Sequence, residues 1–116
     1  MTMLITQEQR EKLLVNGATF DTDENYDPFP VVKLFTPDGA CTWLLTHIEP
    51  ECLDVAFGLC DLGLGHPETG SVYLSGIAMV RGRLGLRVER DRHFTARKPL
   101  SAYVRDAHQA GMIVTG

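Results

Sequence analysis

The sequence has few of the residues that mark stapled, secreted or membrane-spanning proteins. It contains three cysteines, Cys41, Cys52 and Cys60, and no Cys-x-x-Cys pair. We therefore expect reduced, mostly buried thiols rather than a disulfide framework. No apolar run approaches the roughly 20 residues that span a bilayer, and the N-terminus lacks the basic start and the long apolar stretch of a secretory signal. These absences predict a cytoplasmic protein without a membrane segment.

What is present is the composition of an ordinary folded protein. Of 116 residues, 44% are hydrophobic and 22% are charged. A chain of this length can bury about two-thirds of the surface that it exposes when unfolded. We therefore expect one domain over residues 1–116.

Charge is divided unevenly along the chain. Residues 1–70 contain twelve Asp and Glu against three Lys and Arg, a net charge of −9, whereas residues 71–116 contain three against eight, a net charge of +5. Such asymmetry can mark a surface for nucleic acid or for an acidic partner. The interpretation favoured from the sequence is that the two halves pack together and partly offset each other's charge.

Helical patterns stand near both ends of the chain. Thr6 and Gln9 form a capping-box pattern, and Gly17 follows the apolar part of the same run as a helix-ending glycine. Pro99 opens a C-terminal pattern with apolar residues on one face, which Gly111 closes. The predicted helices are residues 7–16, a short turn near 76–81 that Ser75 caps, and 99–110.

Between them we expect a mostly antiparallel sheet of about five strands, which makes the fold class α+β. The predicted strands are residues 31–36, 41–48, 55–62, 71–74 and 86–94. Pro37, Asp38 and Gly39 supply strong turn chemistry between the first two strands. Strict alternation puts His47 on the face of Trp43, and both faces of strand 41–48 are apolar enough to be covered. Strand 86–94 has one face in water and belongs at an edge.

The most unusual segment is the loop at 63–70, between two predicted strands. It has a carboxylate before it, then glycines, an imidazole and a second carboxylate. The favoured interpretation is structural, with Asp61 and Glu68 accepting backbone N–H bonds. Protein recognition is the next hypothesis, and acid–base or cation chemistry follows it. The spacing matches no metal motif, so no metal ion or cofactor is predicted. The candidate binding residues are Asp61, His66 and Glu68, with Glu49, Glu51 and Asp54 on nearby acidic segments.

No catalytic residue is predicted. His47 alternates with Trp43 and Leu45, which is typical of a partly buried, satisfied histidine. A nucleophilic cysteine needs a lowered pKa, whereas Cys60 lies in an apolar strand beside Asp61, where its pKa should be raised.

A basic segment supplies the alternative, nucleic-acid hypothesis. Phosphate binding needs several cations on one surface. Glu89 and Asp91 interrupt the segment, so a salt-bridged surface is the default interpretation. The candidate residues are Arg81, Arg83, Arg87, Arg90, Arg92, Arg97 and Lys98.

Three runs, DPFPVVKLFTPDGACTWLLT, FGLCDLGLGHPETGSVYLS and LGLRVERDRHFTARKPLSAYVRDAHQAG, span nearly the whole chain. Together they resemble a small bacterial family known only as a domain of unknown function, family 2958. The resemblance implies no fold, activity or catalytic residue. It implies a setting, that of an intracellular accessory protein of plasmids and other mobile elements.

The sequence thus favours a non-enzymatic accessory protein that binds an unidentified protein partner through its acidic loops, in host-defence evasion or plasmid maintenance. Nucleic-acid binding through residues 81–98 is the second hypothesis. A small enzyme or metal binder centred on Asp61 and Glu68 is the third.

Overall fold

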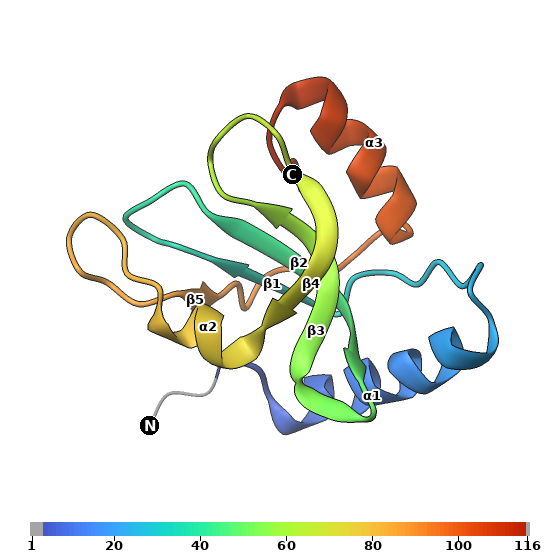
Figure 1. Ribbon diagram of the computed structural model, residues 1–116. Helices are drawn as coiled ribbons and strands as arrows, with labels where there is room; N and C mark the ends of the chain where they lie inside the picture. Colours follow the sequence, from blue (N-terminus) through green and yellow to red (C-terminus); the bar gives the residue numbers. More distant parts are fainter. Residues whose placement is uncertain (1–3, 116) are drawn as a thin grey trace.

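A five-stranded antiparallel sheet forms the centre of the protein (Figure 1). The computed structural model describes residues 4–115. Along the sheet the strands are ordered β4-β3-β2-β1-β5, and the predicted α+β class is confirmed. The elements are α1 (Gln7–Thr22), β1 (Val32–Phe35), β2 (Thr42–Glu49), β3 (Cys52–Asp61), β4 (Glu68–Tyr73), α2 (Leu74–Met79), β5 (Glu89–Arg90) and α3 (Leu100–Ala110).

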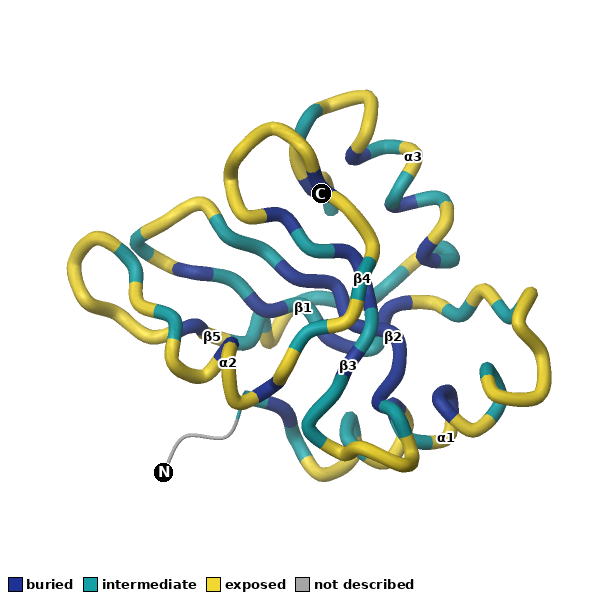
Figure 2. The backbone as a smooth tube through the Cα atoms, viewed as in Figure 1, coloured by how far each residue is buried: buried dark blue, intermediate teal, exposed yellow. Residues whose placement is uncertain are grey.

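Apolar side chains cover both faces of the sheet. On one face Trp43 and Leu45 of β2 pack in a cluster with Leu13 of α1 and Ile77 of α2. On the other face Leu44 and Leu59 pack with Leu100, Tyr103 and Ala107 of α3. Figure 2 shows β2 buried over most of its length. The prediction that this strand is covered on each side is confirmed.

Helix α1 is longer than its sequence pattern indicates. It begins with the predicted capping box at Thr6 but runs past Gly17 to Thr22. A Cβ at Gly17 would lie 2.0 Å from the carbonyl oxygen of Ile48. Gly17 is therefore needed where the helix presses against β2 and does not end the helix. The helix end predicted at residue 16 is wrong.

Strand β2 contains a bulge that changes which way its second half faces. Leu45 pairs with Gly58 and His47 pairs with Phe57, so Thr46 has no partner of its own on β3. An extra residue in one strand reverses the alternation beyond it. His47 therefore lies on the face of Leu44, opposite to Trp43 and Leu45. The face predicted for His47 from strict alternation is wrong for this reason.

The predicted strand 86–94 is reduced to Glu89–Arg90. Before it, Gly85 adopts φ 83° and the Asp38 carboxylate accepts the N–H groups of Leu84 and Leu86 at 2.6 and 3.2 Å. After it, Asp91 accepts the N–H of His93 at 2.9 Å in a local turn. The residues on both sides of β5 are therefore held in turns and do not extend the strand.

The remaining elements differ only in detail from their predictions. Strand β4 begins at Glu68, within the predicted loop, and α2 begins at Leu74 rather than at residue 76. Ser75 lies inside α2 and does not cap it. Helix α3 ends as predicted at Gly111, which has φ 74°.

Candidate functional site

The bulge in β2 turns His47 toward a pocket of about 270 Å³. The pocket lies among the C-terminal part of α1, the segment before β1, the N-terminal part of α3 and the sheet. We call it the His47 pocket. Its lining is largely apolar and consists of Phe20, Tyr26, Asp27, Pro28, Thr46, His47, Phe57, Thr69, Leu100, Ser101 and Val104.

Three aromatic rings are stacked at the pocket wall. The ring of His47 packs against those of Phe20, at 4.8 Å between centroids, and Phe57, at 5.0 Å, with interplanar angles of 20° and 21°. The rings of Phe20 and Phe57 are themselves 6.4 Å apart, so the three rings form a triangular cluster. Phe20 comes from the part of α1 beyond Gly17. The longer helix therefore supplies one wall, and the bulge supplies the ring that packs against it.

A chain of buried and partly buried hydrogen bonds fixes this arrangement. The Tyr26 hydroxyl donates to Asn16 Oδ1 at 3.1 Å, and Asn16 Nδ2 donates to the Thr46 carbonyl at 2.9 Å. The Thr46 hydroxyl donates to the Phe57 carbonyl at 3.2 Å and lies 3.1 Å from His47 Nδ1. The hydroxyl has one proton, so donation to Phe57 requires that Nδ1 carries the imidazole proton and donates to Thr46. The pocket is thus formed before any ligand enters.

The charged groups around the pocket are acidic. Burial lowers the pKa of His47, while Glu49, whose carboxylate is 4.0 Å from Nε2, and Asp21 act in the opposite direction. His47 is therefore neutral at pH 7. Asp27 at the rim accepts the N–H of Ser101 at 3.1 Å and its hydroxyl. Among the lining residues there is no Lys or Arg.

The predicted acidic loop does not form one site. Asp61 is 4% exposed, and its two oxygens accept the N–H groups of Gly63 at 2.8 Å and Ile113 at 3.0 Å. Glu68 pairs with Cys60, the neighbour of Asp61 in β3, so the two carboxylates start from opposite faces of the sheet. His66 is exposed. Asp61 ties the C-terminal segment to the sheet.

The other acidic candidates lie at the far end of β3. Because β3 has ten residues, Glu49 and Glu51 are roughly 30 Å from Asp61 along the strand. Asp54 is bound to Ser75, whose hydroxyl and N–H lower its pKa. Residues 4–115 contain no group of three or more His, Cys, Asp or Glu that could hold a metal ion. The acidic candidates are therefore separate features.

Two of the three thiols are held in their protonated form. Burial raises the pKa of Cys60 to about 11. Burial, followed by the charge of Asp61, also raises the pKa of Cys41. Cys52 is exposed, and Cys41 and Cys60 are only half-buried, which corrects the prediction of mostly buried thiols.

The basic segment is salt-bridged only in part. Lys98 pairs with Asp106, Arg81 donates to the carbonyls of Ala78 and Val80, and Arg90 donates to the carbonyl of Leu4. Within residues 4–115, the remaining four arginines form no ion pair closer than 4.0 Å. These are Arg83, Arg87, Arg92 and Arg97.

A family described as a protein of unknown function, DUF2958, matches residues 4–114. The chain belongs to the DUF2958 family. This confirms the resemblance seen in the three sequence runs. Searches among curated proteins and among solved structures gave no match. In the part that the structure describes, no helix of this DUF2958 chain is long and apolar enough to cross a membrane.

Sequence reasoning missed the pocket of this DUF2958 protein. Phe20 and Tyr26 stand in an acidic, turn-rich stretch that reads as a connection, and Phe57 reads as core. Only the Thr46-His47 pair, polar residues in an apolar strand, gave a signal. Buried polar side chains need hydrogen-bond partners, so such a pair indicates interactions beyond the strand ladder.

Proposed function

We propose that the protein binds a partner protein by accepting one side chain of that partner in the His47 pocket. The observation that carries the proposal is the preformed, largely apolar pocket around a bulge-positioned, hydrogen-bonded His47. β-Bulges are common where a side chain must be re-aimed beside a functional site. A pocket of this kind is the usual place to look for a ligand.

The size of the pocket favours one bulky side chain over a cofactor. Its volume of about 270 Å³ falls just below the range of roughly 300–1,000 Å³ in which small-molecule sites usually lie. Protein interfaces often concentrate their binding energy in one aromatic or aliphatic anchor that fills such a pocket. Because hydrogen bonds of Asn16 and Thr46 already hold the pocket walls in place, little conformational entropy is lost when a ligand binds.

The surrounding charge favours a partner segment with Lys or Arg beside the anchor. Asp21, Asp27 and Glu49 lie at or near the pocket. Complementary charges across an interface steer encounter and fix the orientation of the partner. The acidic half of the chain thus contributes to recognition here, rather than at the loop of Asp61 and Glu68.

A catalytic role has weaker support. The Thr46 hydroxyl is buried and engaged, and no cysteine is among the lining residues. The proposal includes a cytoplasmic setting and an accessory role in mobile elements, as the family resemblance implies, with host-defence evasion or plasmid maintenance as the process served.

Selection of displayed random peptides against the protein tests the proposal. The enriched peptides should share a bulky apolar residue next to Lys or Arg. Thr69→Trp, at the exposed pocket mouth, should weaken their binding roughly tenfold or more, or about 1.4 kcal/mol. Gln109→Trp, exposed near the C-terminal end of α3 and outside both surfaces, is the matched control and should bind as the parent does. Peptides that bind Thr69→Trp unchanged, or no enrichment, would contradict the proposal.

A further inference from the structure

A second concave surface follows the chain from the turn before β5 toward α3. It consists of two hollows of about 730 and 370 Å³ that share Asp91 and His93. We call this surface the β5 trough. It lies at the β5 edge of the sheet, beyond a strand of only two residues. The trough shares no lining residue with the His47 pocket.

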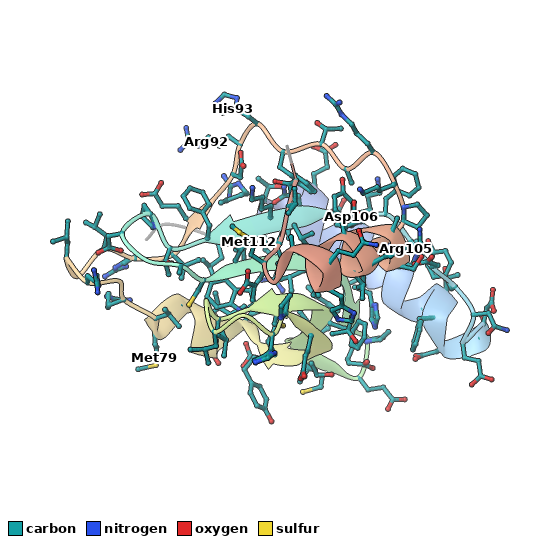
Figure 3. All side chains as sticks on the ribbon, turned by 90° about the horizontal axis from the view of Figure 1, so that it is seen from above. Met79, Arg92, His93, Arg105, Asp106 and Met112 are labelled. Atoms are coloured by element: carbon teal, nitrogen blue, oxygen red, sulfur yellow. The ribbon has the colours of Figure 1, made fainter. Side chains whose placement is uncertain are left out.

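Arginines line the trough along its length. Arg87 and Arg92 line the larger hollow, and Arg97 lines the smaller one. All three are exposed, and none forms an ion pair within the described residues. In Figure 3, Arg92 and His93 lie on the segment after β5 and point away from the sheet. The trough therefore presents a row of cations to solvent.

Ring-bearing side chains line the same hollows as these cations. Phe35 lines the larger hollow, Phe94 lines the smaller one, and His93 lines both. Phe35 and Phe94 are half-buried, so their positions are fixed while part of each side chain stays accessible. A basic groove with aromatic side chains spaced along it is the arrangement that binds single strands, because phosphates meet the cations and bases stack on the rings.

Two acidic residues also line the trough, and their effects differ. Asp91 is partly offset, because its Oδ2 lies 3.6 Å from Lys33 Nζ and its Oδ1 accepts the N–H of His93. Glu89 is exposed, and within residues 4–115 its carboxylate has no cationic partner. Glu89 should therefore oppose an anionic ligand.

We infer that the β5 trough binds single-stranded nucleic acid without sequence preference. Arg87, Arg92 and Arg97 contact phosphates, and Phe35, His93 and Phe94 stack with bases. A duplex fits this surface less well, because its bases are already stacked and because duplex readers insert a helix or a ribbon into a groove, whereas this surface is hollow.

Fluorescence anisotropy with a labelled oligo(dT) of about 15 nucleotides tests the inference. The triple variant Arg87→Gln/Arg92→Gln/Arg97→Gln should bind roughly tenfold or more weakly. Its plot of log K against log salt should be flatter by about 2, because each phosphate contact to a single strand contributes about 0.7. Glu89→Gln should bind more tightly than the parent.

A second triple variant, Arg10→Gln/Lys12→Gln/Arg105→Gln, has the same net charge and is the matched control. It should bind nearly as the parent does. An equal loss in both triple variants would show diffuse charge attraction and overturn the inference. Tighter binding of a duplex of the same length, equal binding of polyglutamate, or no binding at low salt would also overturn it. Unchanged thermal unfolding of each variant confirms that the fold is retained.

Discussion

The His47 pocket and the β5 trough differ in how their polar groups are used. In the pocket, hydrogen bonds link Tyr26 to Asn16 and Asn16 to Thr46, and Thr46 holds His47 against two rings. In the trough, three arginines face solvent and form no ion pair with any residue between 4 and 115. The hydrogen bonds fix the shape of the pocket, whereas the arginines give the trough a positive charge. Binding to the pocket should therefore depend mainly on packing and weaken only modestly with salt, through its acidic rim, whereas binding to the trough should weaken steeply with salt.

The largest expected effect is a loss of stability when α1 is forced away from β2 at Gly17. In Gly17→Ala the new Cβ would lie 2.0 Å from the Ile48 carbonyl oxygen, so helix or strand must move. Because backbone cannot yield as a side chain does, we expect a loss of about 3 kcal/mol or more in the free energy of unfolding. Denaturant unfolding measures it.

Gly76→Ala is the control for this change, since its Cβ would be 3.6 Å from that of Tyr73, an ordinary contact. It should be as stable as the parent or slightly more so. Equal stability of the two variants would show that α1 does not press on β2 as described.

A smaller effect on stability tests whether Asp61 and Glu68 have separate roles or form one functional unit. Asp61→Ala leaves the N–H groups of Gly63 and Ile113 without their acceptor. An unsatisfied buried group costs about 1–3 kcal/mol, so the free energy of unfolding should fall by about that much. Glu68→Ala, at an exposed position, should change it by less than about 0.5 kcal/mol. Similar losses in both variants would place the two carboxylates in one functional unit.

The pH dependence of the free energy of unfolding should include a contribution from His47. Burial lowers the pKa of His47, so the unfolded chain binds the proton more readily than the folded one. This contribution to stability is complete above about pH 6.5 and is lost as the pH falls below it, with a slope of at most about 1.4 kcal/mol per pH unit. His47→Phe should flatten the profile in urea unfolding between about pH 5 and 7. A steeper profile in that variant would contradict the assignment.

The smallest effect concerns thiol chemistry. At neutral pH a thiol reagent should modify exposed Cys52 first. Cys60, with a pKa raised to about 11, and Cys41 should react slowly. Mass spectrometry should find one rapid modification in the folded protein and three in denaturant. Rapid labelling of Cys60 would show that β3 is less protected than described.

Local signals in the sequence predicted the sheet, its first hairpin and the glycine that ends α3. Each rests on residues close to one another, such as the turn at Pro37 and the positive φ of Gly111. Gly17 shows the limit, because a glycine after an apolar run fits either a helix end or a close approach to a neighbour. Only the position of Ile48 decides between them.

The pocket could not be predicted for a related reason. The bulge at Thr46 is defined by pairing with β3, and one extra residue there reverses the face of His47. Asp61 was half predictable, because its bond to Gly63 is local, whereas its bond to Ile113 joins residues 52 positions apart. The bond of Arg90 to the carbonyl of Leu4, which joins residues 86 positions apart, was likewise beyond the reach of local signals.

Each of the two surfaces contains one histidine, so histidine-selective NMR tests their separate roles most directly. A peptide recovered by display should shift the imidazole signals of His47 and leave those of His93 unchanged. Oligo(dT) should do the reverse, shifting His93, which lines the trough, and sparing His47, which lines the pocket. Both ligands shifting the same histidine, or neither ligand shifting its own, would contradict the account.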